Sequence, residues 1–175
     1  FAITMICLYT ENEKFRKWAD MEILHKEVQQ GNTVNIEINQ ENIQIFAVDK
    51  YLVTLQEKKL NFYNSLATNV GEISVEISNA IADVAGRYFI IAEANGKKIY
   101  VISDRRITWQ TETDGEILQI EINENGYVGI VTSDMSYKNI VTLYDSSGKQ
   151  VLRTYLATNK IADISISKNN QHLAI

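Results

Sequence analysis

The sequence predicts an all-β fold of β-propeller-like, four-stranded antiparallel blades preceded by an N-terminal helix. After Gly31 the chain consists of short apolar runs broken by Asn, Asp, Gly and Ser, the pattern of many strands joined by tight turns. These runs also repeat, and helical spacing of apolar residues is confined to the stretch before Gly31. Together the three observations favour an array of equivalent sheets.

Each repeat follows one plan: an apolar strand, a polar turn, a ring and a second apolar strand. The four segments are IQIFAVDKYLVTL, IADVAGRYFIIA, ILQIEINENGYVGIV and IADISISKNNQHLAI, with rings at Tyr51, Tyr88, Tyr127 and His172. A third strand follows in KKLNFYN, KKIYVIS and KNIVTLYD, and a fourth in ATNVGEISVEI, RITWQTE and KQVLRTYLA. The repeats start roughly 36 to 44 residues apart, close to the period of WD-type blades.

The predicted repeats amount to about three and a half blades. They lie near 43–78, 79–115, 116–158 and 159–175. Because propellers close with 4 to 8 blades, we expect an incomplete ring that belongs to a longer chain, with residues 33–39 supplying a strand to a further blade. A β-sandwich with coincidental spacing is the alternative, and the agreement of IADV with IADI disfavours it.

The N-terminal region predicts a membrane anchor and a stalk. Residues 1–9 are mostly apolar but too short to span a bilayer, which takes about 20 residues, so they would be the end of a longer span. Lys14, Arg16, Lys17 and Trp18 then suit a headgroup interface, and apolar spacing over 11–30 predicts a helix. We therefore divide the chain into an anchor end plus stalk, 1–31, and partial propeller, 32–175. A packed helix end or a signal-peptide remnant is the alternative for 1–9.

The composition limits the classes of binding partner that we expect. The net charge of -5 and pI near 5.1 leave no excess of Lys and Arg for phosphates, which argues against a nucleic-acid partner. The single cysteine, Cys7, cannot form an internal disulfide.

Polar residues in the first strands are the candidate site. Asp83 and Asp163 occupy the same place in two repeats and Gln119 occupies it in the repeat between them, and first strands line the channel of a propeller. A ligand or cation could bind there, but a polar position in every blade more often links neighbouring blades by hydrogen bonds.

No catalytic, cofactor-binding or metal-binding residues are predicted. His25 and His172 lack metal-ligand partners at a suitable spacing, and no pattern typical of a nucleophile with its base or of a phosphate loop occurs. Trp109 is interpreted as blade packing. The oxygen-rich turns at 123–126 and 145–148 are interpreted as hairpin turns, not calcium loops.

The repeat units IADVAGRYFIIAEANGKKIYVIS and EILQIEINENGYVGIVTSDMSYKNIVTLYDSSGKQ resemble an uncharacterised family of single-pass membrane proteins from clostridia-like Gram-positive bacteria. The outer part of that family is a WD-repeat or quinoprotein-like propeller. The resemblance implies a membrane helix before FRKWADMEIL and places the repeats outside the cell, at the cell membrane. It implies no site residues.

These observations together predict a non-enzymatic, membrane-anchored propeller that binds a protein or a cell-envelope component. Two alternatives stay open. One is a propeller enzyme whose cofactor or metal site is completed by further blades, and the other is a cytoplasmic WD-repeat-type scaffold in which residues 1–9 form a packed helix.

Overall fold

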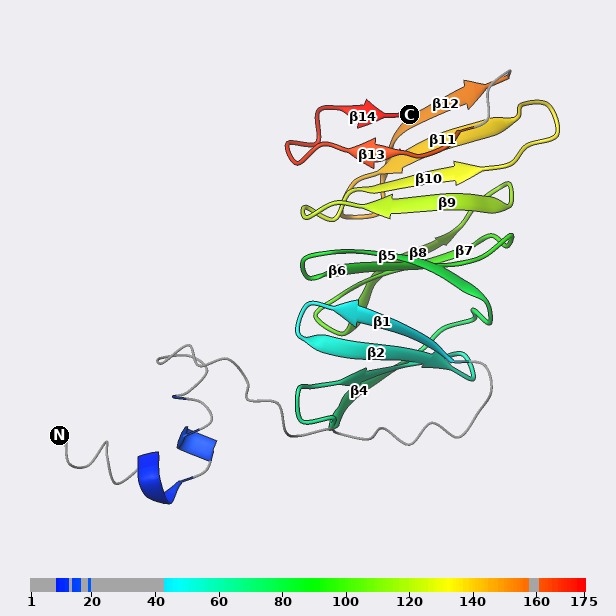
Figure 1. Cartoon of the computed structure of the whole chain (residues 1–175). Helices are drawn as coiled ribbons and strands as arrows, with labels where there is room; N and C mark the ends of the chain where they lie inside the picture. Colours follow the sequence, from blue (N-terminus) through cyan, green and yellow to red (C-terminus); the bar gives the residue numbers. More distant parts are fainter. Residues whose placement is uncertain (1–8, 13, 17–18, 20–42, 158–160) are drawn as a thin grey trace. The chain divides into compact units, whose positions relative to one another are not determined.

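The computed structural model describes residues 9–12, 14–16, 19, 43–157 and 161–175 (Figure 1). The chain divides into two compact units, Phe1–Asn35 and Ile36–Ile175. The boundary predicted at 31/32 lies outside the described residues, as do the strand predicted at 33–39 and residues 1–8 of the predicted anchor.

The N-terminal unit contains short helical turns at 9–11 and 14–16, with residue 19 also helical. Asn12 separates the two turns: its side-chain oxygen accepts hydrogen bonds of 3.1 Å from the amides of Lys14 and Phe15, as the N-cap residue of a new helix does. The helix predicted from residue 11 therefore begins after Asn12, and its continuation over 20–30 lies outside the described residues. Within the described part, none of the helices has both the length and the apolar character needed to cross a membrane.

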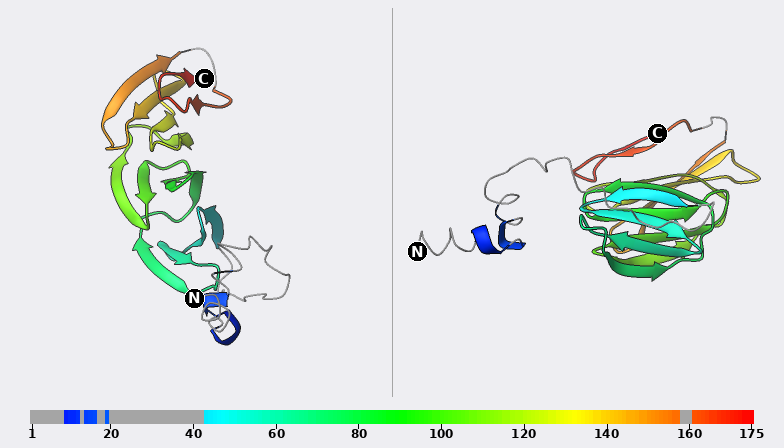
Figure 2. Two further views of the ribbon diagram at one scale, coloured as in Figure 1. Left: turned by 90° about the vertical axis from the view of Figure 1, so that its left-hand side faces the viewer. Right: turned by 60° about the horizontal axis from the view of Figure 1, so that its bottom comes forward.

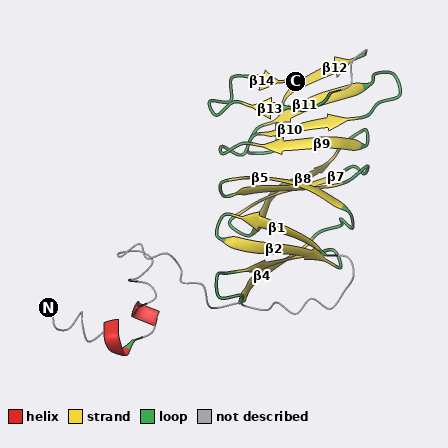
Figure 3. Cartoon of the chain, viewed as in Figure 1, coloured by secondary structure: helices red, strands yellow, loops and turns green. Residues whose placement is uncertain are grey.

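The second unit is all β, with three four-stranded antiparallel sheets and one two-stranded sheet (Figure 3). The first sheet contains β1 (Gln44–Val48), β2 (Tyr51–Gln56), β3 (Lys59–Tyr63) and β4 (Asn69–Ser74). The second contains β5 (Ala80–Ala85), β6 (Tyr88–Glu93), β7 (Lys98–Ser103) and β8 (Arg106–Glu112). The third contains β9 (Ile117–Ile122), β10 (Val128–Thr132), β11 (Asn139–Tyr144) and β12 (Gln150–Leu156), and the last pairs β13 (Ser165–Ile166) with β14 (Leu173–Ala174).

Every sheet is a meander in which each strand pairs with the next one in the sequence. Local turn chemistry explains this order. In the second sheet, Ala85 pairs with Tyr88 across the turn Gly86–Arg87, and Gly86 has a φ of 57°, the left-handed conformation that tight hairpins require. The predicted four-stranded units are therefore present, and the ring that they form is open.

The fourth strand of each large sheet carries a register shift where it pairs with the third strand. The shift falls at Phe62/Tyr63, at Val101/Ile102 and at Leu143/Tyr144. A β-bulge increases the local twist of an outer strand. Its recurrence at one place also aligns β4, β8 and β12 residue by residue.

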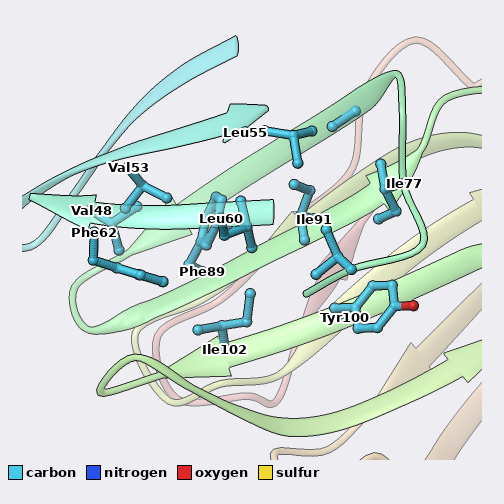
Figure 4. Close-up of a cluster of buried hydrophobic side chains, with 12 residues drawn as sticks. Val48, Val53, Leu55, Leu60, Phe62, Ile77, Phe89, Ile91, Tyr100 and Ile102 are labelled. Carbon is cyan, nitrogen blue, oxygen red and sulfur yellow. The ribbon is translucent and has the colours of Figure 1, made fainter. Parts of the chain in front are cut away.

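The first and second sheets pack face to face over an apolar core (Figure 4). Val53, Leu60 and Phe89 are completely buried there, and the rings of Phe46 and Phe89 lie 5.4 Å apart. The second and third sheets pack in the same way, with Ile90 and Ile130 completely buried. Since both faces of the middle sheet are covered, its two central strands are almost continuously apolar, as expected for strands buried on both faces.

Candidate interaction surface

Asp83 on β5 links the second sheet to the third. One carboxylate oxygen accepts a 2.8 Å hydrogen bond from the amide of Ile122 at the end of β9. The other accepts a 2.8 Å bond from the amide of Val84. The side chain is thus engaged in joining blades.

Gln119 on β9 links the third sheet to the segment before β13. Its Nε2 donates a 2.7 Å hydrogen bond to the carbonyl of Ala162. Gln44 on β1 makes the corresponding contact between the first and second sheets, because it donates to the carbonyl of Ala80 and accepts from the Ala80 amide, both at 2.8 Å. Gln119 therefore matches Gln44 in the structure.

The structural counterpart of Asp83 is Glu121, and the alignment of Asp83 with Gln119 in the sequence was wrong. Glu121 Oε1 accepts a 3.0 Å hydrogen bond from the amide of Ile166, the position that corresponds to Ile122. The alignment failed because it counted residues from the start of each strand. Strand β9 carries a register shift, with Val131 paired to Gln119 and Thr132 to Ile117, whereas β5 pairs with β6 without a shift.

Asp163 differs from the other two predicted positions. It is exposed, and its side chain accepts a 2.9 Å hydrogen bond from the adjacent amide of Ile164. The structure thus does not bring Asp83, Gln119 and Asp163 together as one cluster: Asp83 and Gln119 connect two different pairs of sheets.

Replacing Asp83 with alanine is expected to lower the free energy of unfolding by about 1–3 kcal/mol, because it leaves the buried amide of Ile122 without its acceptor. Asp83→Asn keeps an oxygen at this place and should cost less. Asp163→Ala is the matched control and should stay within about 0.5 kcal/mol of the parent. Urea unfolding followed by circular dichroism measures all three, and equal effects for Asp83→Ala and Asp163→Ala would contradict the linking role.

A small cavity lies between the first two sheets, beside Tyr51 and Phe89. Its volume is about 20 Å³, room for about one water molecule. Arg105 covers it: its guanidinium stacks 5.3 Å from the Tyr51 ring centre and donates a 2.7 Å hydrogen bond to the Val70 carbonyl. The cavity is too small for an organic ligand.

The loops between the second and third strands differ in length among the three large sheets. They comprise residues 57–58, 94–97 and 133–138, so the third sheet has the longest. Asp134 shapes it, since its Oδ1 accepts bonds of 2.8 and 3.0 Å from the amides of Ser136 and Tyr137. An aspartate that binds amides two and three residues ahead fixes a turn locally.

This loop exposes an aromatic platform, defined here as Met135, Tyr137 and Tyr155. Met135 is fully exposed, at 107% of its reference area, and the two tyrosines are 40% and 49% exposed. The rings of Tyr137 and Tyr155 lie 4.9 Å apart with a 49° interplanar angle, so the loop is held against strand β12.

The loop before β9 supports the platform from the neighbouring sheet. The Ser133 amide donates a 2.9 Å hydrogen bond to the Glu116 carbonyl. Arg153 of β12 donates a 2.8 Å bond to Asp114, and that bond is the main reason why the pKa of Arg153 is raised. The same guanidinium lies 5.6 Å from the Tyr155 ring centre, within the range of a cation–π contact.

Sequence reasoning missed the platform because its residues come from two separate segments. Met135 and Tyr137 occur in a stretch, TSDMSYKN, that reads as a plain turn. Tyr155 reads as one ring in a fourth strand. The one signal available was the unequal spacing of second and third strands between repeats.

Sheets of four sequential antiparallel strands, stacked face to face and linked by polar residues of their first strands, define a repeat protein of the β-propeller class. Within that class the chain belongs to a family of unknown function, DUF5711, which matches residues 22–175. No curated protein matches the chain in sequence.

Solved structures resemble the chain at low sequence identity, and one of them is a β-propeller domain. Hsv2 of Kluyveromyces lactis gives a TM-score of 0.58 at 10% identity, over 82% of this chain and 48% of that one. The β-propeller domain of Cps50 (Swd1) from Myceliophteria thermophila gives 0.57 at 14% identity, over 78% of this chain and 48% of that one. This chain thus spans about half the length of these relatives, and the likeness shows the fold.

Proposed function

We propose that the chain is part of a non-enzymatic interaction protein, which binds a protein or a cell-envelope component through the aromatic platform. The observation that carries this proposal is the exposure of Met135, Tyr137 and Tyr155 on the longest of the three equivalent loops. In repeat proteins, insertions into one repeat fall in loops on one face, which is often the binding face.

The chemistry of the platform suits a contact surface. Tyrosine and methionine are enriched in protein interfaces, and methionine adapts its shape to different partners. The platform is also pre-organised, because Asp134 fixes the turn and Tyr155 packs against Tyr137. Groups that are already ordered lose less conformational entropy when a partner binds.

Site-specific photo-crosslinking in the cells that make the protein tests the proposal. A benzophenone side chain at position Met135 should give a defined adduct. The same group at Leu66, which is 65% exposed in a loop of the first sheet, should not. Tyr137→Ala should reduce the Met135 adduct without unfolding the chain. Equal adducts from both positions, or a yield that ignores Tyr137→Ala, would refute binding at the platform.

The second part of the proposal is a tether: the N-terminal segment anchors the chain in the cell membrane as a single-pass protein, with the repeats on the outer side. The apolar run at 1–9 followed by Lys14, Arg16, Lys17 and Trp18 supports it. Protease treatment of intact cells should remove the repeats, and the protein should sediment with membranes before treatment. Recovery of intact protein in the soluble fraction would contradict the tether and leave the platform proposal standing.

A further inference from the structure

Strand β12 is the outer edge of the third sheet, and it carries less charge than the equivalent edge strands. With the strands aligned at their bulges, β4 has Glu72 and β8 has Gln110 where β12 has Arg153. Two residues further along, β8 has Glu112 where β12 has Tyr155. The acidic side chains that β4 and β8 present along their edges are thus missing from β12.

The exposed part of β12 is apolar. Val151, Leu152 and Tyr155 are 49%, 42% and 49% exposed. Between Gln150 and Leu156 the only charged residue is Arg153, whose guanidinium is held by Asp114. In natural proteins, charged residues, proline or short length keep edge strands from pairing with other chains. Strand β12 is seven residues long, contains no proline and has one charged residue.

The backbone of β12 has one partner strand in the described part of the chain. It pairs with β11 from Asn139↔Leu156 to Tyr144↔Gln150, and it ends the order of its sheet. Strand β12, orange in the left view of Figure 2, lies at this edge of the sheet. A free row of strand amides and carbonyls matches the backbone of another extended peptide.

We propose that β12 binds an extended segment of a partner polypeptide as an additional strand, with apolar side chains beside Leu152 and Tyr155 and a carboxylate opposite Arg153. This inference rests on the proposed function and specifies it, because Tyr155 belongs both to the platform and to β12. The partner's backbone hydrogen bonds supply affinity, and the side chains next to Arg153 and Tyr155 supply selectivity.

Charge decides between a foreign partner and a second copy of this chain. If two copies of β12 paired antiparallel about their common centre, Arg153 of one copy would lie opposite Arg153 of the other. Like charges directly opposite each other destabilise a strand pair, whereas an acidic residue there complements the guanidinium. The edge therefore favours a partner segment with a central Asp or Glu.

A peptide designed from β11 is the probe, since β11 already matches β12 with Thr142 opposite Arg153. The peptide has the sequence of residues 138–144 with Thr142→Asp. Its control carries adjacent prolines in addition, at the positions of Ile140 and Val141, so that one proline removes a donor that faces β12. We expect the first peptide to slow amide exchange in β12, but not in β4 or β8, and the control to leave exchange unchanged. Equal protection by both peptides, or none by either, overturns the proposal.

Two variants of the whole chain separate this inference from the proposed function. Leu152→Lys places a charge on the edge and should lower the affinity for the peptide about tenfold. Ile107→Lys, at a 37% exposed position on β8, should leave the affinity for the peptide unchanged. A Met135 photo-adduct that survives Leu152→Lys refutes strand addition and leaves platform binding standing. If the peptide binds but no Met135 adduct forms in cells, only platform binding is refuted, and strand addition at β12 stands. A dimer that Leu152→Lys abolishes assigns the edge to a second copy and overturns the inference.

Discussion

Phe89→Ala is expected to lower the free energy of unfolding by about 3–5 kcal/mol, the range for truncation of a buried phenylalanine. Phe89 is completely buried between the first two sheets (Figure 4). Its ring packs 5.4 Å from the ring of Phe46. The loss combines the apolar surface no longer buried with the cavity that remains. Urea unfolding measures this loss of stability. The slope of the unfolding free energy against urea concentration should be the same in both proteins, because an unchanged slope shows that the denatured state is the same.

The control for Phe89→Ala is Ile107→Ala in the same sheet, which removes a 37% exposed side chain and should cost less than about 1 kcal/mol. Hydrogen exchange adds a test of the repeat architecture. Because Phe89 lies in the core between the first and second sheets and not in the core between the second and third, Phe89→Ala should speed exchange in β2 and β6 more than in β11. Uniform acceleration in all three sheets would mean that they unfold as one unit.

The four-stranded units were predictable because each is encoded locally. A strand, a polar turn and the next strand lie adjacent in the sequence, so the pattern IADVAGRYFIIA already specifies the pairing of β5 with β6. Stacking follows from the apolar residues on both faces of β6 and β7. The structural likeness to a β-propeller domain confirms the part of the predicted fold class that concerns the sheets: all-β, with four-stranded antiparallel blades.

The candidate site was less predictable, because it depends on distances between separate segments. Glu121 was missed because a register shift within β9, absent from β5, makes Asp83 and Gln119 look equivalent in the sequence. The platform needs Tyr155 on β12 to meet Tyr137 in a loop. Pairwise contacts of this kind leave no periodic mark in a single sequence, whereas sheet packing does.

Gly148→Ala is expected to destabilise the chain by about 2–5 kcal/mol, through backbone strain and overpacking together. Gly148 closes the turn after β11 with a φ of 83°. This left-handed conformation costs an L-residue about 1–2 kcal/mol. A Cβ at this position would also lie 2.8 Å from the indole ring of Trp109, which belongs to the neighbouring sheet and packs 5.6 Å from the ring of Tyr144.

Gly86→Ala separates the two contributions, because Gly86 also has a positive φ, 57°, but nothing lies within 4 Å of its added Cβ. It should therefore show the backbone cost alone, about 1–2 kcal/mol. In a Trp18→Phe background Trp109 is the sole tryptophan, and its emission should shift in Gly148→Ala and stay constant in Gly86→Ala. If Gly148→Ala and Gly86→Ala lose equal stability and the Trp109 emission does not shift, the added Cβ at position 148 does not displace Trp109 of the neighbouring sheet. A larger loss for Gly148→Ala means that a turn glycine is required there by contact between sheets as well as by its own φ.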